Sequence, residues 1–379
     1  MDVLYLSISM GAGHLRAAEA LKEYVDQMYP DSRSLVVDTF KYINPLVHKV
    51  FVDGYLSIIK RIPYAYSAVY RMSEQLDNMN KLSHALSKLF SYKLVNLIEE
   101  FKPSIIVCTH PFPLQIVSCL KKAGKISIPS IGILTDYVNH PFWFHDNIEA
   151  YVVAHDNIKQ DMINSGTPEN RIYSYGIPVS KVFLEKKSKE ELLKKYGLLD
   201  KLTVLIMGGS LGFGNIKKIF FSFLNIKEDV QVIVVTGKNQ KLKQQLEDYN
   251  KKNNKKVMLL GYTNEICSLM DISDLIITKP GGMTITEALI KGLPIFIISP
   301  IPGQEERNSH FLTSNGIAER IQKQDDMPNI INKVIDNPYK LANMKKMSQK
   351  VSMPNSGYKI VSLMEKLVYT DNSITKDSI

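Results

Sequence analysis

Short apolar runs alternate with helical patterns along the first half of the chain. Residues 2–9 predict a buried strand, 11–13 a glycine loop, and 15–28 a helix with Ala17, Ala18 and Leu21 on its apolar side. Further strands are predicted at 34–38, 105–109, 130–135 and 150–154. Apolar strands that alternate with helices are typical of parallel sheets covered on both faces. The first half is therefore predicted to form an α/β layer.

The pattern begins again after residue 180. Residues 181–200 are charged and helical, and a second series of strands is predicted at 203–207, 231–236, 256–260, 274–278 and 294–299. We therefore predict an α/β protein with two Rossmann-like domains, 1–180 and 181–355, followed by a C-terminal helix and polar tail, 356–379. The cleft between two such domains is the expected binding site.

Composition and charge narrow the class of protein. The 379 residues include 47 Lys and Arg against 38 Asp and Glu, a net charge of +9 that favours anionic partners. Nucleic acid is not the predicted partner, because no aromatic RNP-like or helix-turn-helix pattern accompanies the charge. Cys108, Cys119 and Cys267 lack disulfide or zinc-ligand spacing, which fits a reducing cytosol.

Membrane insertion and secretion are not predicted either. The apolar runs, such as 293–300, are much shorter than the roughly 20 residues that cross a bilayer. The start of the chain carries Asp2 instead of a basic segment and leads directly into the glycine loop, unlike a signal peptide. We expect the protein to stay on one side of a membrane.

Two glycine loops of the second half are candidates for phosphate binding. GGSLGFG at 208–214 and KPGGMTITEAL at 279–289 each join a strand to a helix start, where free amides and the positive end of the helix dipole favour an anion. The first loop taken alone is equally consistent with a tight turn, and the two loops together are more specific for a diphosphate than either. Glu287 falls in the predicted first helical turn, where it either binds ribose hydroxyls or complements the helix dipole.

A third loop, 299–308, is rich in prolines and polar side chains. Gln304, Glu305 and Asn308 offer several donors and acceptors, which suits a polyhydroxylated ligand such as a sugar. An exposed polar loop without a ligand is the alternative interpretation, and this loop by itself does not decide between the two.

Candidate catalytic residues lie in the first half. His14 follows the loop GAG at a helix N-terminus, where the helix dipole favours the neutral imidazole that a general base requires. A histidine that only caps the helix is the alternative. Asp136 is the second candidate, either as the base or as the residue that orients His14. His110, His140 and His145 also fall in polar loops and rank below His14.

Residues 41–93 form a basic and aromatic segment. It contains eight Lys or Arg, among them Lys60, Arg61 and Arg71, against three acidic residues, with Phe51 and Tyr55 between the charges. This composition suits a helix that lies on an anionic membrane surface. A helix packed on the domain core is the alternative, and the residues alone favour it.

These motifs together resemble glycosyltransferase family 28, and within it the monogalactosyldiacylglycerol synthases and the processive diacylglycerol β-glucosyltransferases. The resemblance runs from near residue 3 to near residue 320 in the family's order. It rests on GAGH at 11–14, THPFP at 109–113, TDYVNHPFW at 135–143, GIPVS at 176–180, GGSLGFG at 208–214, GYTNEICSLM at 261–270, KPGGMTITEAL at 279–289 and PGQEERN at 302–308.

The resemblance implies a GT-B fold, two Rossmann-like domains with a deep interdomain cleft, and an inverting hexosyltransferase. A UDP-hexose, glucose rather than galactose, would be the donor and diacylglycerol the acceptor, with His14 as the base. The implied donor-binding residues are Gly209, Ser210, Gly261, Tyr262, Gly282, Met283, Thr284, Glu287, Gln304, Glu305 and Asn308. The implied acceptor or membrane residues are Phe51, Tyr55, Lys60, Arg61, Arg71, His140 and Trp143.

The family's first loop is richer in glycine, and Ala12 takes one of those positions here, where alanine tolerates fewer backbone angles. No Asp-x-Asp pair occurs in the chain, so we expect neither a metal nor another cofactor. The expected location is cytoplasmic, peripherally attached to the inner face of the cell membrane. Two alternatives stay open: a UDP-GlcNAc transferase acting on a polyprenyl-linked cell-wall precursor, and a catalytically inactive regulator that binds a nucleotide sugar.

Overall fold

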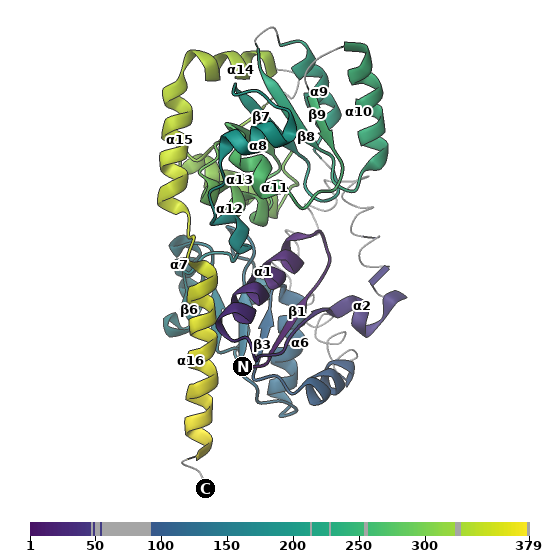
Figure 1. The fold of residues 1–379 in the computed structure, drawn as a ribbon. Coiled ribbons are helices and arrows are strands. Elements are labelled where there is room, and N and C mark those ends of the chain that lie inside the picture. Colours follow the sequence, from purple (N-terminus) through teal and green to yellow (C-terminus); the bar gives the residue numbers. More distant parts are fainter. Residues whose placement is uncertain are drawn as a thin grey trace. The chain divides into compact units, whose positions relative to one another are not determined.

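The protein forms two compact units in a computed structural model (Figure 1). Unit 1 comprises residues 1–181 and 353–379, and unit 2 comprises residues 182–352. The structure describes residues 1–46, 48–49, 54, 92–212, 214–226, 229–253, 257–322 and 327–376.

Unit 1 contains a six-stranded sheet in which all strands are parallel. Its strands lie in the order β2-β1-β3-β4-β5-β6, and Val3 of β1 pairs with Ser34 on one side and Ile105 on the other. The strands are β1 (Val3–Ser7), β2 (Ser34–Asp38), β3 (Ile105–Cys108), β4 (Ser130–Ile133), β5 (Ala150–Val152) and β6 (Ile172–Tyr173). The described helices are α1 (Gly13–Met28), α2 (Thr39–Ile43), α6 (Pro111–Lys122), α7 (Asp156–Asn164) and α16 (Ser356–Lys376), with the short 3-10 helices η1 (Pro141–Trp143) and η2 (Glu169–Arg171).

The apolar side predicted for α1 is the side that it buries. Ala17, Ala18 and Leu21 have no exposed surface, and they lie on one face because residues three and four apart share a helix face. Tyr24 and Val25 extend this buried face to the next turn.

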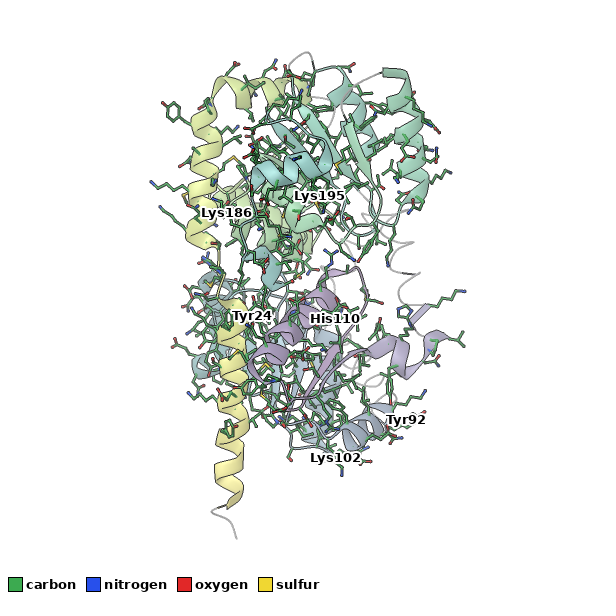
Figure 2. The ribbon with its side chains drawn as sticks, in the orientation of Figure 1. Tyr24, Tyr92, Lys102, His110, Lys186 and Lys195 are labelled. Atoms are coloured by element: carbon green, nitrogen blue, oxygen red, sulfur yellow. The ribbon has the colours of Figure 1, made fainter. Side chains whose placement is uncertain are left out.

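The C-terminal helix α16 belongs to unit 1, where it runs beside α1 (Figure 1). The ring of Tyr24 meets that of Tyr358 edge to face, with centroids 4.8 Å apart (Tyr24 is labelled in Figure 2). A Cβ at Gly357 would lie 2.3 Å from the Tyr24 ring, so this contact requires glycine. The sequence predicted the C-terminal helix, but it did not predict that this helix packs on α1.

Unit 2 contains a second parallel sheet, in the order β12-β11-β10-β7-β8-β9. Its strands are β7 (Thr203–Met207), β8 (Gln231–Val235), β9 (Val257–Leu260), β10 (Leu275–Thr278), β11 (Ile295–Ile297) and β12 (Ala318–Arg320). Its helices are α8 (Lys189–Tyr196), α9 (Ile216–Leu224), α10 (Gln240–Asn253), α11 (Ile266–Asp271), α12 (Gly282–Lys291), α13 (Gln304–Ser314), α14 (Met327–Asp336) and α15 (Pro338–Val351); the 3-10 helix η3 (Lys181–Phe183) lies at the boundary of the units.

The structure corrects several predicted elements. The charged stretch 181–200 forms an α-helix only at α8, which begins after the cap Ser188 and ends at Gly197 with φ 64°. The strands β6 and β12 were not predicted, because one has two residues and the other reads Ala-Glu-Arg. None of the helices in the described part of the chain is long and apolar enough to cross a bilayer.

In each sheet there is one strand from which the chain adds later strands first on one side and then on the other. In unit 1 the order proceeds from β1 to β2 and then resumes with β3 on the opposite side of β1; in unit 2 it proceeds from β7 through β9 and resumes with β10 on the opposite side of β7. Ligands of open parallel sheets bind at the carboxyl ends of the strands at such a switch point. The expected sites are therefore the loops after β1 and β3, and those after β7 and β10.

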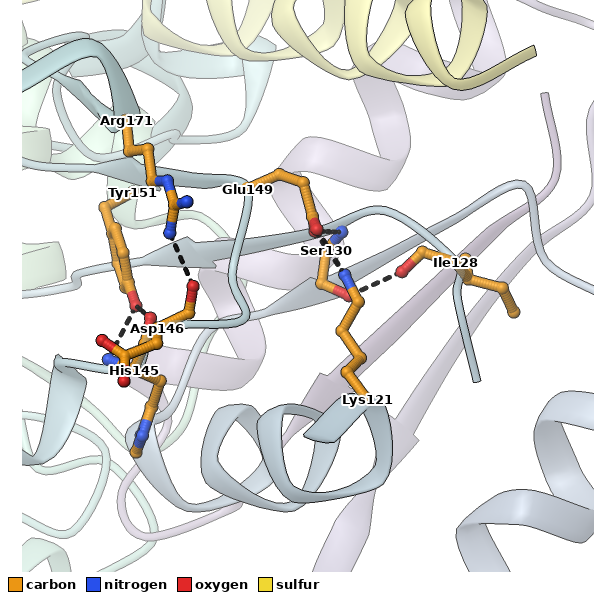
Figure 3. A network of polar contacts seen from close by, with 8 residues as sticks. All are labelled: Lys121, Ile128, Ser130, His145, Asp146, Glu149, Tyr151 and Arg171. Atoms are coloured by element: carbon orange, nitrogen blue, oxygen red, sulfur yellow. Dashed lines mark hydrogen bonds and ion pairs between the residues drawn. The ribbon is translucent and has the colours of Figure 1, made fainter. Parts of the chain in front are cut away.

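A polar network lies at the N-terminal ends of strands in the unit 1 sheet, opposite to the carboxyl ends where the site is expected (Figure 3). Lys121 Nζ lies 2.6 Å from Glu149 Oε1, while Glu149 Oε2 accepts from the backbone N–H of Ser130 at 2.7 Å. The Tyr151 hydroxyl donates to the carbonyl of His145 at 2.7 Å. These contacts connect α6 with the starts of β4 and β5.

Candidate functional site

His14 lies at the switch point of unit 1, as the second residue of α1. Its Nδ1 is 2.9 Å from the carbonyl oxygen of Thr109 and 2.7 Å from the hydroxyl oxygen of Thr135. A carbonyl oxygen only accepts hydrogen bonds, so Nδ1 carries the proton. In the neutral ring, Nε2 then keeps its lone pair, which is the arrangement that a general base needs.

Burial keeps the His14 ring neutral. It lowers the pKa of His14 from 6.5 to about 4, against a smaller opposite effect of the hydrogen bond to Thr109. Low polarity disfavours the charged form of an imidazole. The sequence argument attributed the neutral form to the helix dipole, whereas in the structure burial is the main cause.

The loop before His14 accommodates alanine without strain. Ala12 has φ −99° and ψ −13°, which any residue adopts, and it is the N-cap of α1. The positive angle of this loop, φ 83°, falls on Gly11. The missing glycine therefore does not disturb the loop's conformation.

Two threonines hold Nδ1 of His14, and the orienting role of Asp136 stays a prediction. The oxygens that hold His14 Nδ1 come from Thr109 and Thr135, and Asp136 is the next residue along the chain. Thr135 is buried, so its hydroxyl is held in place. A role for Asp136 as the base stays a prediction.

A polar cluster near the ends of β1 and β2 was missed from the sequence. Ser9 Oγ lies 2.9 Å from His48 Nε2, and Asp38 Oδ2 lies 3.6 Å from the same nitrogen. In a Ser-His-Asp triad the serine and the aspartate contact opposite ring nitrogens, so this cluster is not a triad. Its only signal in the sequence was a polar residue at the end of each of two predicted strands.

Three other histidines act as helix caps. Nδ1 of His110 accepts from the N–H of Phe112 at 3.1 Å, and Nδ1 of His140 accepts from the N–H of Phe142 at 3.2 Å. His155 caps α7 in the same way. Trp143, predicted at the acceptor or membrane surface, is 6% exposed, which leaves little of its ring for a membrane.

The glycine loop 208–214 lies at the switch point of unit 2. A Cβ at Gly212 would come 2.2 Å from the carbonyl oxygen of Thr236, so the loop packs directly on the turn after β8. The carbonyl of Ser210 accepts from the N–H of Lys238 at 2.9 Å, which fixes the same contact. Gly209, with φ 69°, has open space at its Cβ position, so a ligand is able to approach the backbone there.

The second glycine loop ends at the start of α12. The N-cap is Gly281, and the first N–H bonded within the helix is that of Ile285, which donates to Gly281 O at 3.0 Å. The amides of Gly282, Met283 and Thr284 therefore lack helical acceptors and lie at the positive end of the dipole. This arrangement suits a diphosphate.

The structure places Glu287 one turn later than predicted. It is the sixth residue of α12, in the second turn instead of the first, and it is 3% exposed. Its position is thus too far along the helix for a role that only complements the dipole, which acts mainly within the first turn. A contact with the ribose stays a prediction.

An ion pair connects the second and third loops. Lys279 Nζ lies 2.8 Å from Glu305 Oε1, and Glu305 Oε2 accepts from the N–H of Ile301 at 2.7 Å. A Cβ at Gly214 would lie 3.1 Å from Cγ of Lys279, so the lysine stem passes over the end of the first glycine loop. Lys279 thus contacts all three loops of the predicted donor site.

The third loop contributes one residue that holds a neighbouring loop in place. Asn308 is fully buried, and its amide donates to the carbonyl of Pro280 at 3.0 Å. This bond holds the KPGG loop, and the predicted contact of Asn308 with the donor stays a prediction. Gln304 is the first residue of α13.

Tyr262 lies where a flat ligand is able to stack. Its ring is 49% exposed, and Lys238 Nζ lies 5.9 Å from the ring centroid. Gly261 precedes it at the end of β9. An exposed tyrosine beside a cation suits a nucleobase joined to phosphate.

Part of the predicted site lies outside the described residues, namely Phe51, Tyr55, Lys60, Arg61 and Arg71. In the part of the chain that the structure does describe, no cluster of three or more His, Cys, Asp or Glu side chains is arranged to hold a metal ion. That the reaction needs no metal stays a prediction.

Comparison with solved structures defines the class of protein. MurG of Acinetobacter baumannii superposes with a TM-score of 0.60 at 15% identity, covering 96% of this chain and 99% of that chain. HepE of Anabaena in complex with UDP superposes with a TM-score of 0.57 at 16% identity, covering 98% and 100%. The chain has the GT-B fold.

Sequence comparison defines the family. Residues 14–179 match the family described as monogalactosyldiacylglycerol (MGDG) synthase, and residues 203–361 match the glycosyltransferase family 28 C-terminal domain. The chain is 32% identical over 383 residues to the processive diacylglycerol β-glucosyltransferase of Bacillus pumilus, covering 99% of this chain and 96% of the relative. It belongs to glycosyltransferase family 28, in the diacylglycerol glycosyltransferase branch.

Proposed function

We propose that this protein transfers a hexose, glucose rather than galactose, from a UDP-sugar to diacylglycerol and forms a β-glycosyl diacylglycerol with inversion. The names of its relatives support glucose and diacylglycerol, and the UDP bound to HepE supports the nucleotide part of the donor. The observation that carries the proposal is His14 at the switch point of unit 1, with its Nδ1 proton held by Thr109 and its Nε2 lone pair available.

On the acceptor side, His14 Nε2 takes the proton of the diacylglycerol hydroxyl. The hydroxyl oxygen attacks the anomeric carbon of the hexose, and the bond from that carbon to the β-phosphate oxygen breaks with its electron pair going to UDP. Attack opposite to the leaving group converts an α-linked donor into a β-glycoside. A positioned base of this kind contributes about 10²–10⁴-fold to the rate.

On the donor side, uncharged backbone groups receive the negative charge that develops on UDP. The amides of Gly282, Met283 and Thr284 face the diphosphate, and the open backbone at Gly209 lets it approach. Lys279 adds a cation between the loops. Donors fixed before the reaction stabilise the departing group without reorganisation.

We further propose that the enzyme acts while attached peripherally to the cytoplasmic face of the membrane. The basic and aromatic composition of residues 41–93 supports this location. The described flanks of that segment add exposed apolar side chains: Tyr42, Tyr92 and Leu46, the last 72% exposed. Lys93 Nζ donates to the carbonyl of Ile43 at 2.6 Å, so the two flanks lie together.

The decisive experiment incubates the protein with UDP-glucose or UDP-galactose and diacylglycerol liposomes, and identifies the glycolipid by mass and anomeric linkage. A β-glucosyl diacylglycerol is expected. An α-linked product would refute inversion, and transfer of GlcNAc to a polyprenyl-linked acceptor in its place would refute the acceptor assignment. Activity that is lost with EDTA and restored by a divalent ion would refute the metal-independent mechanism.

Two variants separate the candidate bases. His14→Gln is expected to lower kcat by about 10²–10⁴-fold. Asp136→Asn, which keeps the size of the side chain, is expected to lower it much less. The reverse order would make Asp136 the base.

Membrane attachment has its own test. Charge reversal of Lys60, Arg61 and Arg71 is expected to weaken binding to liposomes in proportion to their anionic lipid content. Reversal of Lys186, Lys194 and Lys195 in unit 2, near α8, provides a control with the same change of net charge. Equal loss in both sets would indicate a general effect of charge and would contradict the proposed surface.

A further inference from the structure

A second imidazole lies against the proposed base. His14 follows β1 and His110 follows β3, which are neighbouring strands at the switch point. Their ring centroids are 4.7 Å apart and the ring planes are inclined by 78° (His110 is labelled in Figure 2). Both residues keep part of their surface exposed.

The two rings carry their protons on opposite nitrogens. The N–H of Phe112 only donates, so Nδ1 of His110, 3.1 Å away, uses its lone pair to accept. The proton of neutral His110 is therefore on Nε2, whereas that of His14 is on Nδ1. The two neighbouring rings thus offer one acceptor, His14 Nε2, and one donor, the Nε2–H of His110.

The surroundings keep this arrangement in place. Burial, and then the neighbouring His14, lower the pKa of His110 well below its usual value, so the ring stays neutral at physiological pH. The cap on α6 fixes the ring's orientation through Nδ1. Within the described part of the chain, neither Nε2 has a protein hydrogen-bond partner.

We propose that His110 contacts the acceptor directly, its Nε2–H donating a hydrogen bond to an ester carbonyl oxygen of diacylglycerol while His14 Nε2 accepts from the hydroxyl. Diacylglycerol offers one hydroxyl, which gives up a proton, and ester oxygens, which only accept. An acceptor nitrogen and a donor nitrogen on two neighbouring rings match these two groups. The proposal rests on the function proposed above and adds the residue that recognises the ester.

The test combines a variant of the protein with a variant of the substrate. Diacylglycerol is compared with a dialkylglycerol of equal chain length, in which ether links replace the esters and no carbonyl is present. In the unaltered protein, kcat/KM is expected to be at least about fivefold higher for the ester substrate, the size of one hydrogen bond. Equal values for the two acceptors would overturn the proposal without any variant being needed.

His110→Ser removes the donor while keeping a cap, because a serine oxygen also accepts from the N–H of Phe112. It is expected to lower kcat/KM for diacylglycerol by about fivefold or more and to leave the value for dialkylglycerol within about twofold. Equal loss for both acceptors would show that His110 acts only through the fold or through His14, and would overturn the proposal.

A matched variant measures the effect of the cap alone. His155→Ser changes the same kind of cap on α7, where Nδ1 accepts from the N–H of Asn157 at 3.3 Å. Its Tm gives the cost of exchanging a histidine cap for serine. Should His110→Ser fail to fold, the comparison of the two acceptors in the unaltered protein decides. Absence of any glycolipid from the unaltered protein would instead refute the proposed function.

Discussion

Thr135 places its hydroxyl oxygen 2.7 Å from Nδ1 of His14, although 121 residues separate the two along the chain. The carbonyl of Thr109 fixes the proton on the same nitrogen, so the Thr135 oxygen accepts from this N–H as well. A neutral imidazole whose Nδ1–H is held by two oxygens has one orientation and one tautomer. The proposed base is thus oriented before a substrate binds.

Replacing Thr135 by valine removes this hydroxyl and keeps the shape of the side chain. We expect kcat to fall by up to about tenfold, because one hydrogen bond contributes about 0.5–1.5 kcal/mol. KM for the UDP-sugar is expected to stay unchanged, since the donor residues lie in unit 2. Thr135→Ser, which keeps the hydroxyl, provides the control and should retain most of the activity. A loss confined to KM would contradict the positioning role.

The lowered pKa of His14 predicts activity at unusually acid pH. In the proposed mechanism the neutral ring is the active form, and burial lowers its pKa from 6.5 to about 4. The rate kcat/KM should therefore stay nearly constant from pH 7 down to about pH 5.5 and fall about tenfold per unit below pH 4. His110, the titratable neighbour of the ring, has a lowered pKa too, because burial disfavours its charged form.

The lowered pKa of His14 also affects the stability of the fold, so the pH experiment needs a control for unfolding. The folded state binds fewer protons than the unfolded state between pH 6.5 and pH 4, so the free energy of unfolding decreases as the pH falls through this window. Circular dichroism at each pH separates loss of fold from protonation of the base. An acid limb with its midpoint near 6.5 in a folded protein would show that His14 is not buried as described, or is not the base.

The strands of both sheets were predictable because apolar runs of four or five residues are buried on both faces. Val3 to Leu6 and Val204 to Met207 are all buried. A strand buried on both faces requires a continuous apolar run, and such a run is recognisable in the sequence. The short strands β6 and β12 lack such a run and were missed. Local pattern thus identified the strands that form the centre of each sheet.

The contacts within the site were much less predictable. His14 and the two glycine loops were recognised from their place between a strand and a helix. That Thr109 and Thr135 hold His14 depends on the order β1-β3-β4 in the sheet, which no local pattern specifies. Asn308 was assigned to the sugar because it is polar, while its burial against Pro280 depends on how α13 packs.

Glu149 is expected to matter for stability and not for the reaction (Figure 3). It accepts from the N–H of Ser130 and pairs with Lys121. These residues lie at the N-terminal ends of the strands, whereas His14 follows the carboxyl end of β1. Glu149→Ala leaves the largely buried Lys121 ammonium without this partner. The free energy of unfolding in urea should fall by about 1–3 kcal/mol, while kcat and KM at 25 °C stay within about twofold.

A variant at another glutamate tests whether this effect is specific. Glu169 pairs with Lys159 at 3.0 Å and is 69% exposed, so Glu169→Ala should change the free energy of unfolding by less than about 1 kcal/mol. Equal destabilisation by the two variants would contradict a special role for the Glu149 network. A large fall in kcat with Glu149→Ala would contradict its separation from the site.

The ion pair between Lys279 and Glu305 allows charge and fold to be tested separately. Lys279→Met removes the cation near the predicted diphosphate site and leaves Glu305 without its counter-charge. We expect the Kd for UDP, measured by calorimetry, to rise about 10- to 100-fold, because a hydrogen bond to a charged group contributes about 1.5–3 kcal/mol. The free energy of unfolding should fall as well, because a partly buried carboxylate loses its partner.

The double variant Lys279→Met with Glu305→Gln removes both charges. Its free energy of unfolding should recover most of the loss, while its Kd for UDP stays high, since the cation is still missing. Glu305→Gln alone keeps Lys279 and should bind UDP nearly normally. If it nevertheless raises KM for the UDP-hexose, Glu305 contacts the sugar, as the family resemblance implies. Recovery of UDP binding in the double variant would refute the assignment of Lys279 to the diphosphate, because its charge would then act only through the fold.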